Sequence, residues 1–178
     1  MTNHGRALAL AGAQLRGHRR IVEVAVRQDG RAIEYADETL RRDPDLVVAA
    51  VRQRACALEL SEGRHDFEIV LRACAVDGSA LRYADEAFRK DAVVVLAAVK
   101  QNGWALGYAD AALRADRNIV LAAVAQNGLA LENADALLRD DREIVQAAVK
   151  QDSFALKFAS QDLRNDSQMK LLSVEQTL

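Results

Sequence analysis

A chain of 178 residues, 51% of them apolar, is long enough to fold alone around its own core. Aromatic residues supply only 4%, so Ala, Val and Leu must fill that core, which favours closely packed helices. The 24 basic and 26 acidic residues give a net charge of -2, which disfavours nucleic acid as a partner because non-specific phosphate binding needs excess positive charge. No apolar run approaches the ~18 residues that span a bilayer, so we expect no membrane segment.

The N-terminal stretch allows two interpretations. Residues 1–22 contain arginines but no acid, a bias typical of a mitochondrial presequence. We favour a structural role, because the same stretch already fits the repeat described below. Cys56 and Cys74 allow at most one disulfide bond, which a domain of this size does not need. We therefore expect a reducing, cytoplasmic compartment, with mitochondrial import as the alternative.

One phrase recurs along the chain, and its clearest copy reads AVKQNGWALGYADAALRAD from Ala98 to Asp116. Its register is marked by Gly5, Gly30, Gly78, Gly103 and Gly128, with Ala55 and Ser153 replacing glycine in two further copies. Successive copies are 25 residues apart, except that the step from Ala55 to Gly78 is 23. Self-similarity at a fixed period is the signature of stacked structural units.

Each unit begins with an aspartate that precedes an apolar run. Aspartate is a preferred N-cap residue, and Pro44 suits the first helical position after such a cap. The predicted N-caps are Asp43, Asp66, Asp91, Asp116, Asp141 and Asp166. The run from Ile119 to Val124 ends near Asn127-Gly128, where we expect the glycine to adopt the left-handed conformation that caps a helix. The pattern predicts one long helix in each unit.

A second, shorter helix is expected after each glycine. Ala130, Leu131, Ala134 and Leu138 are spaced to share one helical face. Asp135 is suited to start a turn of its own, so the pattern fits either one helix or two. The alternation of apolar and polar residues that is typical of strands does not occur in the sequence, which disfavours a β-solenoid.

These elements predict an all-α solenoid of about seven 25-residue helical-hairpin repeats in one domain, since helices this short bury their apolar faces only against neighbours. The expected units are 1–18, 19–43, 44–66, 67–91, 92–116, 117–141 and 142–166, followed by a C-terminal cap over 167–178. Because the chain starts in the middle of a unit, one hypothesis is that it is a fragment of a longer array with a purely structural role.

The recurring phrase resembles the repeat catalogued as domain of unknown function 4116. The best copies run over Ala98 to Asp116, Ala123 to Asp141 and Ala25 to Asp43. The copy around Ala55 departs, since it lacks the Gly, the Tyr and the L-R-x-D ending. The resemblance implies tandem helical modules used for interaction, and it brings no catalytic residues.

No catalytic or cofactor motif occurs in the sequence. It has no glycine-rich phosphate loop, no G-x-S-x-G and no H-E-x-x-H. His65, Cys56 and Cys74 lack the paired spacing of metal ligands, and Cys74 is expected in the core. We therefore expect no enzyme, no metal and no cofactor.

An arginine stands two positions before most of the unit-starting aspartates. Its copies are Arg41, Arg89, Arg114, Arg139 and Arg164. A residue that recurs in every unit serves first to build the unit. We expect this arginine to be structural, with its charge compensated by the following aspartate, and to bond to a neighbouring unit.

Two columns of the repeat vary in a way that suggests binding. The position after the glycine becomes bulky and apolar in three successive units, at Trp104, Leu129 and Phe154. If exposed, these side chains form a hydrophobic stripe; the alternative is that they are half-buried packing residues. The third position of the long helices is apolar in the middle of the chain, at Val48, Leu71, Leu96 and Leu121. This second column fits either a groove or contact between adjacent helices.

We therefore expect a non-enzymatic protein-protein interaction or scaffold module with an unknown protein partner. The alternative is a modular single-stranded RNA-binding protein. Such proteins need several varied polar or stacking side chains on one helix face of every unit. Here the corresponding positions are mostly Ala, Val and Leu, which disfavours RNA.

Overall fold

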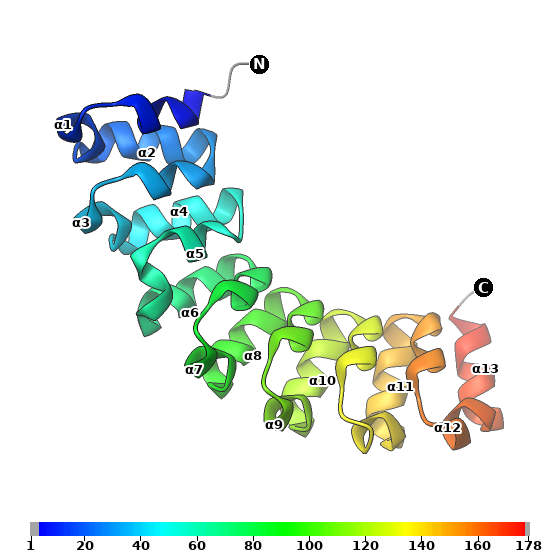
Figure 1. Cartoon of the computed structure of the whole chain (residues 1–178). Helices are drawn as coiled ribbons and strands as arrows, with labels where there is room; N and C mark the ends of the chain where they lie inside the picture. The colour runs from blue at the N-terminus through cyan, green and yellow to red at the C-terminus, as the bar shows by residue number, and fades with distance from the viewer. Residues whose placement is uncertain (1–3, 177–178) are drawn as a thin grey trace. The chain divides into compact units, whose positions relative to one another are not determined.

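The computed structural model describes residues 4–176 and is all-α, with no strand among these residues (Figure 1). The chain divides into two compact units, one up to Phe88 and one from Arg89. Both units are built from the same repeat, so the expected all-α repeat fold is confirmed.

Unit 1 alternates long helices with short ones. Its elements are η1 (His4–Leu10), α1 (Ala13–Arg16), α2 (Arg19–Gln28), η2 (Gly30–Tyr35), α3 (Glu38–Arg41), α4 (Pro44–Gln53), α5 (Ala57–Leu60), η3 (Glu62–His65), α6 (Phe67–Val76), η4 (Gly78–Tyr83) and α7 (Glu86–Arg89), where η marks a 3-10 helix and α7 ends at the division.

Unit 2 repeats the same order. Its elements are α8 (Ala92–Gln101), η5 (Gly103–Tyr108), α9 (Ala111–Arg114), α10 (Arg117–Gln126), η6 (Gly128–Asn133), η7 (Leu138–Asp140), α11 (Arg142–Gln151), η8 (Ser153–Phe158), α12 (Gln161–Asn165) and α13 (Ser167–Glu175). The last of these, α13, occupies the place of a further long helix, within the segment predicted to be a cap.

The long helices begin at the predicted aspartates. In α10 the carboxylate of Asp116 accepts hydrogen bonds from the backbone N–H groups of Asn118, at 2.9 Å, and Ile119, at 3.0 Å. These bonds satisfy two of the N–H groups that have no partner inside a helix. The N-caps Asp43, Asp91 and Asp141 also accept two such bonds, and Asp66 and Asp166 accept one each, from the N–H groups of Ile69 and Met169.

The long helices do not end as predicted. No glycine among the described residues has a positive φ, so the expected left-handed cap at Gly128 is wrong. The helix α10 ends instead at Asn127, whose backbone is extended (φ -150°, ψ 111°). The Asn127 side chain accepts a hydrogen bond from the N–H of Leu129, at 3.0 Å, and thereby starts the next helix.

The question of one or two short helices is settled by a break at the alanine of the Y-A-D phrase. In the clearest repeat, η5 ends at Ala109, whose backbone is extended (φ -70°, ψ 155°). Asp110 then caps α9 by accepting from the N–H of Ala112, at 3.1 Å. The predicted second helix is therefore a 3-10 helix followed by a separate short helix.

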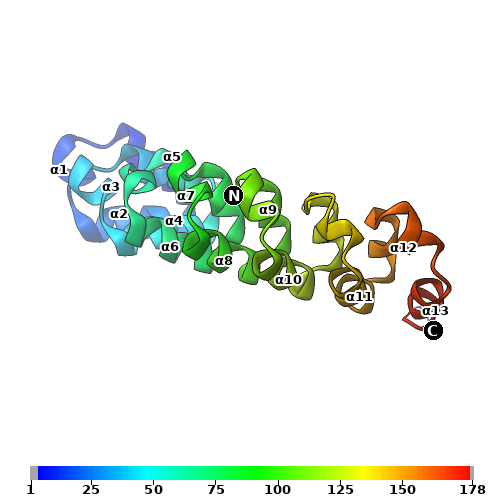
Figure 2. The ribbon, with the colours of Figure 1, turned by 90° about the horizontal axis from the view of Figure 1, so that it is seen from below.

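Each unit has two layers, with the core between them. In unit 2 the long helices α8, α10 and α11 pack against one another in sequence (Figure 2), and η5, η6 and η8 do the same. Val120 and Val124 on α10 and Leu131 on η6 are fully buried between these layers. Burial of such aliphatic side chains is the main stabilising term. Alanines among them allow neighbouring helices to approach closely.

Polar bonds between successive repeats fix their register. In unit 2 the N–H of Asp135 donates to the carbonyl of Arg114, and the N–H of Ser160 donates to that of Arg139, both at 2.9 Å. Three residues after Arg114, Arg117 at the start of α10 pairs with Asp141, the N-cap of α11. The recurrent arginine thus bonds to its neighbour through its backbone carbonyl. The aspartate two residues later caps a helix and forms no ion pair with Arg114 or Arg139 in the described chain.

Candidate binding surfaces

Trp104, Leu129 and Phe154 each occupy the second position of a 3-10 helix in unit 2. Because η5 packs against η6 and η6 against η8, the three side chains lie on successive packed elements. Trp104 is 40% exposed and Phe154 71% exposed, whereas Leu129 is half-buried. Two of the three residues predicted from the repeat register therefore present large apolar surfaces to solvent.

The start of each of these 3-10 helices is held on both sides. Asn102 accepts from the N–H of Trp104 at 3.1 Å, and Asp152 accepts from that of Phe154 at 2.9 Å. The N–H of Gly103 donates to the side-chain carbonyl of Gln126, on the next long helix. Gly128 makes the same bond to Gln151. The side chains that follow the glycines are thus displayed from fixed backbone positions.

The second predicted column lies within the layer of long helices. Val48 is only 8% exposed, and Leu71, Leu96 and Leu121 are half-buried. Their helices pack against neighbouring long helices within each unit: α4 against α6, and α8 against α10. Most of each side chain is therefore covered by the next repeat.

Val48 also borders an open depression of about 530 Å³ in unit 1. Its other walls include the charged residues Arg27, Asp45, Arg52 and Arg72. Arg72, on α6, forms an ion pair at 2.8 Å with Asp45, on the long helix α4 of the preceding repeat. At Val48, therefore, the groove suggested by this column has mainly charged and polar walls.

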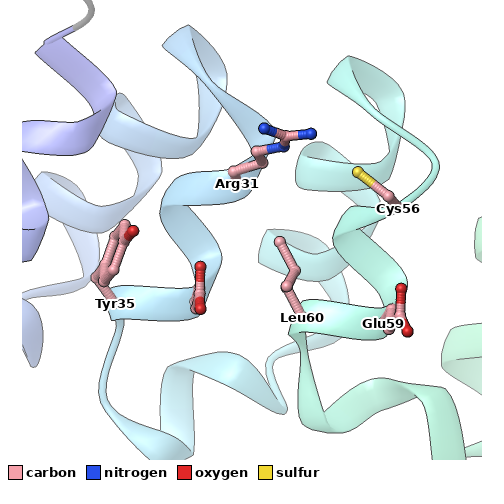
Figure 3. Close-up of a pocket in the computed structure, with 6 residues that line it drawn as sticks. Arg31, Tyr35, Cys56, Glu59 and Leu60 are labelled. Carbon is pink, nitrogen blue, oxygen red and sulfur yellow. The ribbon is translucent and has the colours of Figure 1, made fainter.

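A pocket of about 300 Å³ that sequence reasoning missed lies in unit 1 (Figure 3). Figure 3 shows Arg31 and Tyr35 on one side and Cys56, Glu59 and Leu60 on the other. Glu34 also lines the pocket. It opens between η2 and α5, at the repeat that is two residues short and forms α-helix instead of 3-10 helix. The signals for it in the sequence were the two-residue deletion and the loss of the Gly and Tyr from this copy of the repeat.

Two residues of this pocket occupy the same position of the repeat as the residues of the apolar stripe. Arg31 and Cys56 occupy the position after the glycine, as Trp104 does in unit 2. Of the charged residues there, Arg31, Glu34 and Glu59 form no ion pair with any residue that the structure describes. The outer face of the short helices is therefore the surface on which exposed side chains vary from repeat to repeat.

The cysteines and the acidic residues do not form a metal site in the described part of the chain, where no three His, Cys, Asp or Glu side chains come together. Both cysteines are free thiols. Cys74 is fully buried, as expected, and burial raises the pKa of its thiol to about 12. No helix between residues 4 and 176 is long and apolar enough to cross a membrane.

Stacked helical repeats with a variable outer face define a helical-repeat protein. Within this class, the family described as Domain of unknown function (DUF4116) matches residues 3–61, 66–114 and 116–174, and the chain belongs to this family. No curated protein and no solved structure matches the chain.

Proposed function

We propose that the chain is a non-enzymatic protein-interaction module whose contact surface is the outer face of η5, η6 and η8. The observation that carries the proposal is the exposure of Trp104 and Phe154 on successive packed helices. Tryptophan and other aromatic residues are enriched among the side chains that dominate binding energy at protein interfaces. An exposed tryptophan in a chain with 4% aromatic residues favours recognition over packing as its role.

The partner that fits this surface is a protein segment with apolar side chains flanked by acidic ones. Lys100 and Lys150 lie in the last turns of α8 and α11 and are exposed. Each precedes its aromatic residue, Trp104 or Phe154, by four positions. Basic residues at the rim of an apolar surface attract acidic groups and set orientation, while the apolar contact supplies most of the affinity.

The test compares capture of proteins from the native host on immobilised wild-type chain and on variants. Phe154→Ala and Trp104→Ala are expected to reduce capture of one protein at least tenfold, since loss of a hot-spot side chain costs about 2 kcal/mol or more. Val93→Ala is the matched control. Val93 is 57% exposed, but it lies in the first turn of α8, whereas Trp104 follows the last turn of that helix. Adding the captured protein should shift the emission of the single tryptophan to shorter wavelength.

Equal capture by all three variants, or no capture by the wild-type chain, would contradict the proposal. RNA is tested in parallel by fluorescence polarisation with labelled single-stranded oligonucleotides at physiological salt. We expect affinities no tighter than the weak non-specific range of ~10⁻⁴ M. Nanomolar RNA binding that Trp104→Ala abolishes would instead identify the stripe as a base-stacking platform.

A further inference from the structure

A second pocket, of about 270 Å³, lies between two successive repeats of unit 2. Arg114, at the end of α9, lines it from one repeat. Asn133, at the end of η6, and Arg139, in η7, line it from the next. Asp135 and Ala136 also line the pocket.

Three of the residues that line this pocket carry polar groups without partners. The Nε–H groups of Arg114 and Arg139 are buried and have no hydrogen-bond partner among residues 4–176. Neither guanidinium group pairs with a carboxylate there, although Arg117 and Arg142 in the same unit both do. The amide of Asn133 likewise makes no hydrogen bond to a described residue. Since buried polar groups in proteins almost always have a partner, this cluster is suited to an external acceptor.

In unit 1 the arginine at the equivalent position pairs with a carboxylate of the chain itself. Arg41 stands at the same repeat position as Arg114, and its guanidinium meets the carboxylate of Glu62 at 3.4 Å. Glu62 directly follows Ser61, whose hydroxyl accepts from the N–H two residues later, as the carboxylate of Asp135 does from Leu137. The residue after Asp135 is Ala136, which has no carboxylate. The Nε–H group of Arg41 also has no hydrogen-bond partner among the described residues, so the repeats differ in the carboxylate that pairs with the guanidinium group of Arg41 and that Arg114 lacks.

The space for a ligand arises from a change in residue type. The position held by Asn133 is occupied by a larger side chain in the other repeats, namely Leu10, Tyr35, Leu60, Tyr83, Tyr108 and Phe158. An asparagine occupies less volume than a tyrosine and adds an N–H₂ donor to the wall. The same substitution thus opens the pocket and makes it polar.

We propose that the pocket formed by Arg114, Asn133 and Arg139 binds a single carboxylate group. The planar guanidinium fork matches two carboxylate oxygens, and such charge-assisted pairs are the stronger class of hydrogen bond. Asp135 also lines the pocket, so two arginines and one aspartate give it a net charge of +1. A carboxylate group neutralises this charge, whereas a doubly charged phosphate group would leave the pocket with a net negative charge. This site is independent of the aromatic stripe.

Binding can be followed by NMR through the chemical shifts of the two arginine Nε–H groups. In ¹H–¹⁵N spectra of the labelled full chain, the Arg114 and Arg139 Nε–H signals are assigned with Arg114→Lys and Arg139→Lys. Sodium acetate, the peptide Gly-Glu-Gly with blocked ends, and inorganic phosphate are titrated at constant ionic strength. We expect saturable shifts of both signals with the two carboxylate probes. The signal of Arg27, which pairs with Glu23 on α2, should not follow that curve.

Two variants distinguish the pocket from a general effect of charge. Ala136→Glu supplies the carboxylate that unit 1 has, so both signals should move without ligand and the titration should weaken at least tenfold. Asn133→Tyr introduces the tyrosine that three other repeats have at this position and should likewise weaken the titration at least tenfold, while the backbone spectrum remains that of a folded protein. Peptide binding at least tenfold tighter than acetate identifies an acidic side chain of a partner as the source, and equal binding identifies a free carboxylic acid.

The proposal is overturned if the carboxylate probes produce only linear shifts equal to those of Arg27. It is also overturned if phosphate saturates the signals at a lower concentration than either carboxylate. A titration that Ala136→Glu and Asn133→Tyr both leave unchanged would mean that the anion binds elsewhere, and this outcome would also contradict the assignment.

Discussion

The backbone carbonyl oxygen of Ala148, in α11, would lie only 2.3 Å from a Cβ atom built on Gly128. In unit 1 the carbonyl of Ala50 stands in the same relation to Gly30, also at 2.3 Å. Contacts shorter than 3.0 Å essentially never occur for real Cβ atoms, so any side chain at these positions forces the repeats apart. The repeated glycine is therefore needed for close approach between neighbouring repeats.

Gly128→Ala is expected to lower the free energy of unfolding by about 1–3 kcal/mol, the usual effect of overpacking. The added methyl group meets backbone, which has little freedom to move, and displaces the bond from Gly128 to Gln151. The control is Gly12→Ala, because a Cβ there meets nothing within 4 Å and the backbone is extended. Urea denaturation should show the control within about 0.5 kcal/mol of wild type. Equal effects of the two substitutions would contradict this explanation of the glycine.

The position of each glycine could be predicted from the sequence, whereas its role could not. A left-handed cap and a close backbone approach both require a residue without Cβ, so one residue type fits both explanations. Asn127 adds to the ambiguity, because Asn-Gly is typical of a turn with positive φ. Only the packing of Gly128 against Ala148, which is distant in sequence, separates the two explanations.

Of the candidate binding surfaces, one could likewise be predicted from the sequence and one could not. The column of Trp104 and Phe154 follows from the register alone, because a fixed period places equivalent residues on equivalent faces. The Arg114 pocket does not, since its defining feature is two arginines that lack the carboxylate partner that Arg41 has. That absence depends on how closely two repeats approach. The change from tyrosine to Asn133 was visible in the sequence, but only the structure shows that Asn133 lines the same pocket as two arginines.

Truncation of three apolar residues in unit 2 should reduce stability in the order of their burial. Phe154, 71% exposed, should cost about 0.5 kcal/mol when changed to Ala, as surface substitutions do. Leu131 is fully buried, and Leu131→Ala should cost about 2–5 kcal/mol. Trp104, at 40% exposure, should fall between them, at about 1–2 kcal/mol. Chemical denaturation measures all three, and a loss for Trp104→Ala as large as that for Leu131→Ala would assign Trp104 to the core.

The two thiols should differ sharply in reactivity. Cys56 is half-buried and lines the pocket in Figure 3, whereas Cys74 is fully buried. Burial, and secondarily the nearby Asp77, raise the Cys74 thiol pKa to about 12, so at pH 8 only a fraction of ~10⁻⁴ is thiolate, the reactive form. A disulfide reagent should therefore modify one thiol per native chain and two in denaturant. Cys56→Ser should abolish the native reaction, and rapid modification of both thiols in the native chain would contradict the burial of Cys74.

The ion pair between Arg142 and Asp166 should make stability depend on pH in the acid range. Arg142 donates to the Asp166 carboxylate at 2.6 Å, and Met169 donates its backbone N–H to it at 3.0 Å. The guanidinium group, and then that N–H, lower the pKa of Asp166 below its ordinary value of 3.8. A carboxyl group whose pKa is lower in the folded state stabilises the fold above its unfolded pKa. This stabilisation is lost as the pH falls through the folded pKa.

Asp166→Asn isolates this effect, because asparagine is also a good N-cap and keeps the bond to Met169. The variant should melt below the wild type at pH 7, and the two melting temperatures should converge as the pH falls from about 4 to 2.5. Asp162→Asn, on α12, is the control, since Asp162 forms no ion pair with another described residue. Its melting curve should run parallel to that of the wild type over the same range. If the difference between wild type and Asp166→Asn stayed constant down to pH 2.5, the ion pair would contribute nothing to the acid sensitivity of the fold.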